Sequence, residues 1–317
     1  MPHLRSTLAT LLLLGAVALT GCADREEPAG TEGDDDGAFP VRVQAEGAPA
    51  VTLETRPERI VSLSPSATET LYAVGAGEQV VAVDSASTYP EQAPRTDLTG
   101  LNPDPEAILT HQPDLVVVSA DLENKLTDAL APTGTKTLVL PDARTLDAAY
   151  EQFELVGKAT GHPADGADVA SRTREDLAKI IADTPEPEQP LTYYHELDQT
   201  FYSVTSATFI GQVYDQFGLT NIADGDDPNA AGGYPQLSAE TILQANPDLI
   251  FLADTVCCGQ NAETIAKRPG WDTLTAVQEG RVVELNDDLA SRWSPRVVEF
   301  ARSVSEAVTA AVSGASA

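Results

Sequence analysis

The sequence predicts an α/β protein in which two Rossmann-like lobes are joined by a single long rigid helix, with a ligand cleft between the lobes. Two observations lead to this prediction. Short β-branched runs alternate with helix-forming segments through the body of the chain, and that alternation favours mainly parallel sheets. In addition, one helix-to-strand segment occurs twice, which indicates two lobes of the same design.

Seven short segments rich in β-branched residues predict strands, at 59–63, 80–83, 115–119, 137–140, 191–195, 249–253 and 282–285. Between the first two, Ser64-Pro65-Ser66 is typical of a helix start and Gly75 of a helix end, so we expect a helix through Ala73. The same strand-helix-strand pattern continues in both halves of the chain.

The repeated segment covers residues 106–118 and 240–252, which share six identities in thirteen aligned positions. Both copies start with a glutamate and place Pro-Asp-Leu directly before a strand. Upstream, Ser66-Ala67-Thr68 recurs as Ser206-Ala207-Thr208. Two amphipathic units could agree by coincidence, but the identities fall at the helix-to-strand junctions. We therefore expect homologous lobes at residues 39–144 and 190–317.

Residues 145–189 are expected to link the lobes through helices that break at Gly161-His162-Pro163. From Pro163 an apolar stripe formed by Val169, Leu177, Ile180 and Ile181 predicts a helix to Asp183. At 1.5 Å per residue this helix reaches about 30 Å, long enough to brace both lobes. Ligands commonly bind in clefts at such domain interfaces.

The N-terminal residues predict an export signal followed by a tether. Arg5 precedes an apolar run at 8–19 that is too short to span a bilayer. The run ends in Leu19-Thr20-Gly21-Cys22, which resembles the bacterial lipobox; the resemblance implies a signal peptide at 1–21 and lipidation of the Cys22 thiol. A chance cysteine is the alternative. Residues 22–38 are acidic and rich in glycine, and we expect a disordered tether to the outer face of the cytoplasmic membrane.

The formal net charge is −30 at pH 7, which argues against nucleic acid as a partner. The chain beyond the tether is long enough for a substantial core, and we expect a monomer. The sequence contains no Gly-x-Ser-x-Gly elbow, no glycine-rich phosphate loop and no His-Glu-x-x-His. Gly75-Ala76-Gly77 precedes a predicted strand rather than a helix, so an enzyme is not expected.

Several motifs, in this order, resemble the helical-backbone substrate-binding proteins that serve importers of cobalamin, ferric siderophores and haem. They are residues 56–69 (Arg-Pro-Glu-Arg-Ile-Val-Ser-Leu-Ser-Pro-Ser-Ala-Thr-Glu), Tyr89-Pro90, residues 113–116, residues 234–240 and Trp293-Ser294-Pro295-Arg296. The resemblance implies a solute-binding protein outside the cytoplasm, without a permanent cofactor, whose transported ligand is a metal chelate. Its implied partners are an ABC permease and its ATPase. A surface lipoprotein that binds a chelate without an importer is the alternative.

The resemblance also implies a role for the two repeated glutamates. In this family one acidic residue on each lobe docks into arginines of the permease, and Glu106 and Glu240 are the matching positions. Charge pairs of this kind set orientation and on-rate more than affinity. The alternative is that both glutamates only favour the N-terminal end of a helix dipole.

The family holds its ligand against loops at the carboxyl ends of strands. The residues that this nominates are Ser64, Ser66, Tyr89, Tyr194, His195, Glu196, Tyr234, Cys257, Cys258, Asp288 and Arg292. Tyr89 and Tyr234 suit a flat or partly apolar chelate, although core packing is the alternative for each. Arg292 could meet an anionic periphery or form a surface salt bridge.

His195 and Glu196 could bind a metal axially, although a lone histidine at a strand end is more often structural. The sequence has no histidine cluster of the kind that carriers of bare zinc need, so any metal is expected to arrive already chelated. For Cys257 and Cys258 we expect a disulfide between neighbours that gives the ligand a hard apolar edge. A free thiol pair and a soft metal site are the alternatives.

Overall fold

The computed structural model describes residues 38–225 and 227–314. The predicted signal peptide at 1–21, the lipidation at Cys22 and all but the last residue of the predicted tether lie outside these ranges. Within them, no helix combines the length and the apolar character that crossing a membrane requires.

Each lobe contains a four-stranded parallel sheet, and the two sheets share one strand order. The first sheet runs β4-β3-β5-β6, formed by β3 (Ile60–Leu63), β4 (Val80–Val83), β5 (Leu115–Val118) and β6 (Lys136–Val139). The second runs β8-β7-β9-β10, formed by β7 (Thr192–Glu196), β8 (Thr220–Asn221), β9 (Leu249–Leu252) and β10 (Val282–Glu284). The two-lobed α/β prediction is confirmed, and all seven predicted strands are present within one or two residues.

Three short strands were not predicted. β1 (Val41–Val43) and β2 (Val51–Leu53) form a separate antiparallel pair, and β8 has two residues. Strands this short do not display a period of two long enough to be recognised in a sequence.

The repeated segment builds the same turn in both lobes. The carboxylate of Asp114 accepts hydrogen bonds from the backbone N–H of Glu58 and Arg59, at 2.7 and 3.1 Å. The carboxylate of Asp248 accepts the equivalent bond from the N–H of Thr192 at 2.8 Å. Each aspartate thereby fixes the start of the central strand beside it. The repeated Pro-Asp-Leu is therefore a structural signature that the two lobes share.

The second sequence match has no such structural basis. Ser66, Ala67 and Thr68 lie inside α1 (Pro65–Ala73), whereas Thr208 is the N-cap of α6 (Phe209–Asp215), where it accepts a hydrogen bond from the Gly211 N–H. The two triplets occupy different positions relative to their helices, so their agreement is a coincidence.

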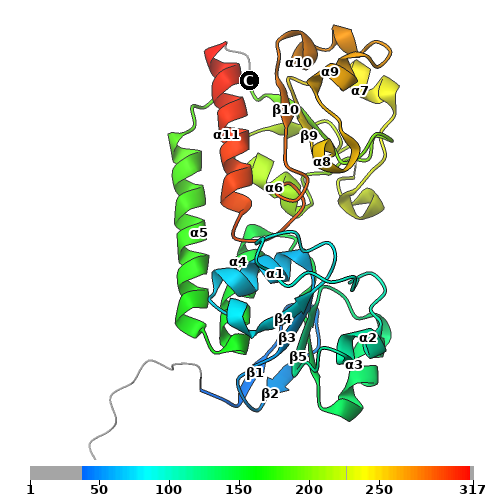
Figure 1. The fold of residues 1–317 in the computed structure, drawn as a ribbon. Helices are drawn as coiled ribbons and strands as arrows, with labels where there is room; N and C mark the ends of the chain where they lie inside the picture. Colours follow the sequence, from blue (N-terminus) through cyan, green and yellow to red (C-terminus); the bar gives the residue numbers. More distant parts are fainter. Residues whose placement is uncertain (1–37, 226, 315–317) are drawn as a thin grey trace, which may run out of the picture. The chain divides into compact units, whose positions relative to one another are not determined.

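One long helix, α5 (Pro163–Asp183), runs beside both lobes and joins them, as predicted (Figure 1). α4 (Leu146–Thr160) ends at Gly161, whose φ of 80° is left-handed, and α5 begins two residues later, so the predicted helix break is confirmed. Near this break the helices approach so closely that a Cβ on Gly157 would lie 2.8 Å from the Cα of Gly166. Val169 and Leu177 are buried along α5, which packs against both α4 and α11 (Val297–Ser313).

The other helices are short and lie around the two sheets. They are α2 (Pro105–Leu109), α3 (Lys125–Leu130), α7 (Ala239–Ala245), α8 (Thr255–Cys258), α9 (Ala262–Ala266) and α10 (Thr275–Gln278). α2 and α7 carry the repeated segment and precede β5 and β9, the equivalent strands of the two lobes.

The carboxyl ends of the two sheets face each other. The segment after β4 meets the segment after β10, where Arg292 donates to the carbonyl oxygen of Ala86 at 2.9 Å and the Thr88 hydroxyl donates to Asp288. Because the strands within each sheet are parallel, all their carboxyl-end loops share this side. Any ligand held between the lobes therefore meets these loops first.

Candidate functional site

Exposed apolar side chains gather on the carboxyl-end loops. Five large hydrophobic residues there are well exposed, each after a different strand: Tyr89 (43%) after β4, Leu122 (78%) after β5, Tyr202 (41%) after β7, Tyr234 (43%) after β8 and Val256 (72%) after β9. In the part of the chain that the structure describes, only Leu101 and Val312 are comparable, and Leu101 lies further along the connection after β4. Such a concentration on one side of both lobes is typical of a binding surface.

Two of the three tyrosines predicted to contact ligand, Tyr89 and Tyr234, lie on this surface. The guanidinium carbon of Arg296 lies 3.9 Å from the centre of the Tyr89 ring, which is a cation–π contact. Burial raises the pKa of Tyr234; the charge of Asp142 raises it further, and that of Arg144 lowers it. Because Asp142 and Arg144 follow β6, the loop after β6 lies within electrostatic range of Tyr234. Tyr89 and Tyr234 therefore occur where segments of the two lobes approach.

Arg292 is not free to meet an anionic ligand. Its side chain is 8% exposed and lies 2.8 Å from a carboxylate oxygen of Glu69 and 2.5 Å from one of Asp288. Glu69, on α1, also accepts from the Ser294 hydroxyl and from Arg296 at 3.3 Å. The predicted ligand contact is instead part of a buried ion-pair network between the lobes. Sequence reasoning missed Glu69 although it lies within the motif at 56–69.

Tyr194 and His195 lie in the core, inside strand β7, rather than on the loop that follows it. Both are fully buried. The His195 Nδ1 lies 2.8 Å from the Tyr214 hydroxyl, and burial lowers the pKa of His195 from its ordinary value of 6.5 to about 3. A neutral histidine enclosed in this way cannot reach a bound metal, so the axial-ligand hypothesis does not fit this structure.

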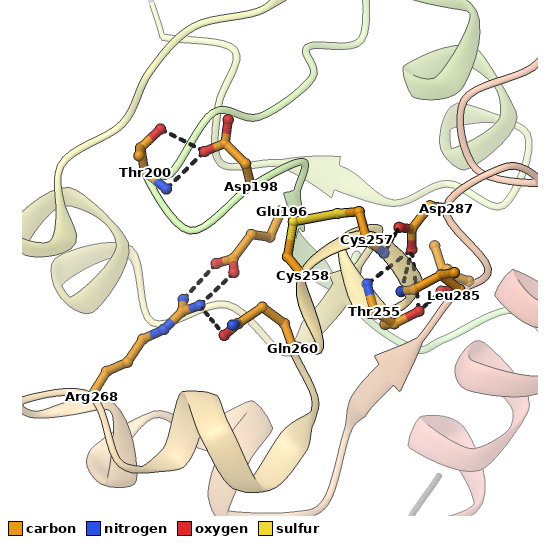
Figure 2. Close-up of a disulfide and its surroundings, with 11 residues drawn as sticks. Glu196, Asp198, Thr200, Thr255, Cys257, Cys258, Gln260, Arg268, Leu285 and Asp287 are labelled. Carbon is orange, nitrogen blue, oxygen red and sulfur yellow. Dashed lines mark hydrogen bonds and ion pairs between the residues drawn. A yellow bond between two sulfur atoms is a disulfide. The ribbon is translucent and has the colours of Figure 1, made fainter. Parts of the chain in front are cut away.

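Glu196 ends β7 in a buried cluster that the sequence did not reveal (Figure 2). Arg268 donates two hydrogen bonds of 2.6 Å to its carboxylate and a third, of 2.8 Å, to Gln260. Asp254 lies beside this pair with both carboxylate oxygens buried and without a hydrogen-bond partner. Burial, followed by the charge of Glu196, raises the pKa of Asp254 to about 7. Glu196 is thus a structural ion-pair partner rather than a ligand contact.

The predicted disulfide between Cys257 and Cys258 is confirmed (Figure 2). Both residues are exposed at the end of α8. The carboxylate of Asp287 holds this short helix by accepting the N–H groups of Thr255, Val256 and Cys257, at 2.9, 3.0 and 2.7 Å. The free-thiol and soft-metal alternatives are therefore wrong. Across the described ranges, no three metal-binding side chains cluster in a way that would hold an ion.

The remaining nominated residues near the first lobe are structural. Ser64 is buried and caps α1 by accepting the Ala67 N–H at 3.4 Å, and Ser66 is buried in the first turn of the same helix. Asp288 is partly buried by its pair with Arg292.

Glu106 and Glu240 occupy the same place in the two lobes. Each is exposed and lies in the first turn of its helix, α2 or α7, after an N-cap residue, Asp104 or Ser238. Neither carboxylate is needed for capping, because the N-cap side chains already accept the backbone N–H groups. Both glutamates remain available for a partner.

Two depressions lie away from the carboxyl-end loops. One, of about 410 Å³, is lined by residues of α5 and α6 and by the connection at 184–190. The other, of about 420 Å³, lies between α4, α5 and α6. Neither contains any of the residues predicted to contact ligand.

Residues 60–289 match the family described as periplasmic binding protein. The chain belongs to this family. The matched region spans both lobes. Because the family comprises solute-binding proteins rather than enzymes, this periplasmic binding protein is not an enzyme. The resemblance inferred from the sequence motifs is confirmed.

Relatives with assigned names extend the comparison. The chain is 30% identical to the uncharacterized ABC transporter substrate-binding lipoprotein YvrC of Bacillus subtilis (strain 168), over 96% of this chain and 97% of that protein. It is 32% identical to a cobalamin-binding protein of Halobacterium salinarum, over 93% of this chain and 82% of that protein. The crystal structure of the periplasmic vitamin B12-binding protein BtuF of Vibrio cholerae matches with a TM-score of 0.63 and 28% identity, covering 80% of this chain and 98% of that one.

Proposed function

We propose that this periplasmic binding protein captures a metal chelate of the cobalamin class outside the cytoplasm and delivers it to an ABC permease and its ATPase. The observation that carries the proposal is the set of exposed apolar side chains on the carboxyl-end loops of both lobes. A large ligand with apolar faces would bury this surface, and each square ångström of apolar area removed from water contributes about 25 cal/mol.

The charges on these loops favour an uncharged or cationic chelate over an anionic one. The segments after the second-lobe strands (197–208, 222–238, 253–261 and 285–296) contain no lysine, and their only arginines are Arg292 and Arg296. Both pair with Glu69. On the second lobe, haem, with two carboxylates, or an anionic ferric siderophore would meet aspartates without a free arginine to bind, and Arg144, exposed on the first-lobe loop after β6, would be the arginine left to it. Cyanocobalamin avoids most of this repulsion, because its corrin side chains are neutral amides and its one phosphodiester charge is balanced by the metal centre.

The names of relatives support the same ligand class. Two of the compared proteins are named for binding cobalamin or vitamin B12, and the chain is 32% and 28% identical to them. Ferric siderophores remain the second candidate class, and a cationic or neutral one would be compatible with the loops.

For delivery, we propose that Glu106 and Glu240 dock into arginines of the permease. One exposed carboxylate per lobe, at equivalent positions, matches a transporter with two similar halves. A Glu106→Ala, Glu240→Ala variant should bind ligand with unchanged affinity and fail in uptake by cells. Glu175→Ala, which removes a carboxylate exposed on α5, is the matched control. Unaltered uptake by the double variant would sink the docking role.

We further propose that lipidation of Cys22 holds the protein on the outer face of the cytoplasmic membrane. The relative YvrC is named as a lipoprotein. Wild-type protein should fractionate with membranes, and a Cys22→Ala variant should be released from them. Equal distribution of the two would contradict the anchor.

Calorimetric titration of the full-length protein in mild detergent tests the ligand. Cyanocobalamin, haem and a panel of neutral, cationic and anionic ferric siderophores are compared. Saturable one-to-one binding of cyanocobalamin is expected. Binding of haem or an anionic siderophore alone would overturn the argument from charge, and binding of none would remove the support for a chelate carrier.

A further inference from the structure

Leu122 and Val256 occupy equivalent positions in the two lobes. Each lies four residues after the last residue of its strand, β5 or β9, and these strands are equivalent in the repeated segment. Both side chains are exposed, by 78% and 72%. Single exposed apolar residues are common and need no explanation. A matched pair, one residue on each lobe and both at the carboxyl ends of the sheets, does call for an explanation.

The turn that carries Leu122 is fixed in an unusual conformation. Glu123 and Asn124, directly after it, both have left-handed backbones, with φ of 58° and 57°. Asp121, directly before it, accepts the N–H groups of Leu126 and Thr127, each at 2.9 Å. Left-handed residues other than glycine cost free energy and persist where the surroundings enforce them, often at ligand contacts. The backbone thus holds Leu122 on the surface instead of allowing it to fold back.

The turn that carries Val256 is fixed by different means. Asp287 accepts three consecutive N–H groups of α8, including that of Val256. The disulfide then joins the next two residues, Cys257 and Cys258, which extend the apolar surface with polarisable sulfur. A rigid apolar contact loses little conformational entropy when a ligand covers it.

Hydrogen bonds join the lobes on one side of this pair, and charges of the first lobe act on Tyr234 of the second lobe on the other side. The segments after the edge strands β4 and β10 touch through Thr88, Asp288 and Arg292. The segments after the other edge strands, β6 and β8, approach where Asp142 and Arg144 act on Tyr234. β5 and β9 lie inside their sheets, between these two meeting points. Leu122 and Val256 therefore lie in the central part of the facing loops.

We infer that Leu122 and the ledge formed by Val256, Cys257 and Cys258 hold opposite faces of a flat macrocyclic chelate, and so select such a ligand over a compact polar one. This inference rests on the proposed function and names the contacts that set its specificity. Two similar apolar surfaces on opposing lobes fit a ligand that presents ring or methyl surface to each lobe, as cyanocobalamin does with its methylated corrin on one side and its benzimidazole on the other. A compact hydroxamate siderophore, whose surface is mainly polar, would gain less from either.

The test compares the full-length wild type with Leu122→Ser, Val256→Ser and the double variant, titrated with cyanocobalamin. Each single substitution should weaken binding roughly tenfold, and the double roughly a hundredfold, because the lost apolar burial is additive for separate contacts. Val312→Ser, which alters an exposed apolar residue at the end of α11, should leave the affinity unchanged. All four variants change surface residues and should keep the wild-type unfolding curve.

The outcomes separate this inference from the function on which it rests. Failure of the wild-type protein to bind cyanocobalamin overturns both the proposed function and the paired contact. Wild-type binding together with unchanged affinity in the double variant overturns only the paired contact. Hydrogen exchange provides a second measurement: ligand should slow exchange in both 120–127 and 255–259. Protection of one segment alone would contradict a two-sided grip.

Discussion

The carboxylate of Glu69 lies 2.8 Å from the guanidinium of Arg292, across the joint between the lobes. Both side chains are almost fully buried, and Ser294 and Arg296 complete the network around the glutamate. The pair joins α1 of the first lobe to the segment after β10. It fixes how the carboxyl-end loops of the two lobes face each other.

Replacement of Glu69 should therefore be costly. Glu69→Ala removes one of the two carboxylates that pair with the buried Arg292 and leaves Asp288, so the cost should lie in the lower part of the range of about 3–5 kcal/mol for a broken buried ion pair. The free energy of unfolding, measured by urea denaturation, should fall by this amount relative to wild type. Asp168→Ala removes an exposed pair with Arg172 and should change stability by less than about 1 kcal/mol. Equal losses of stability from the two substitutions would show that the buried network stabilises the fold no more than an exposed ion pair does.

His195 should make the protein less stable in mild acid. The pKa of the folded histidine is about 3, below its ordinary 6.5, so between these values only the unfolded chain binds the proton. Stability is then full above pH 6.5 and falls as the pH drops toward 3, by up to about 1.4 kcal/mol per pH unit. His195→Asn lacks this proton, so its urea-unfolding free energy should decline less than that of wild type between pH 7 and pH 5. Parallel curves would contradict the buried neutral histidine.

Asp254 should act in the opposite direction. Its folded pKa of about 7 lies above the ordinary 3.8, so the folded carboxyl stays protonated where the unfolded one ionises. Its contribution to the free energy of unfolding is fully present below pH 3.8 and is lost as the pH rises through 7, because the ionised carboxylate is then repelled by Glu196. Asp254→Asn should therefore gain stability relative to wild type between pH 4 and pH 7, and keep a constant difference above that. A variant that tracks wild type at every pH would show that Asp254 ionises normally.

The disulfide should matter little for folding. Because it joins adjacent residues, it closes a very small loop, and the Cys257→Ser, Cys258→Ser variant should lose only about 1 kcal/mol of unfolding free energy. Intact mass after alkylation should show no adduct at these cysteines before reduction and two after it. Two adducts without reduction would contradict the disulfide.

Local signals in the sequence were sufficient for the elements of the fold. The helix break at Gly161 and Pro163 and the Pro-Asp-Leu turns were predicted correctly because their signals lie in a few neighbouring residues. The candidate site was predicted in part. Tyr89, Tyr234 and the disulfide do lie on the facing loops, but Tyr194, His195 and Arg292 are buried.

Two α/β lobes of one design, the helices that join them and the membership of a solute-binding family were predictable from the residues alone. Which polar side chains are buried in ion pairs and which are exposed became evident from the packing of distant segments. Arg292 is held by Glu69, which lies 223 positions away in the chain, and no local pattern marks Leu122 as an exposed residue. Burial and charge pairing depend on what packs against a residue from distant segments, whereas turns and strand patterns depend on its neighbours in sequence.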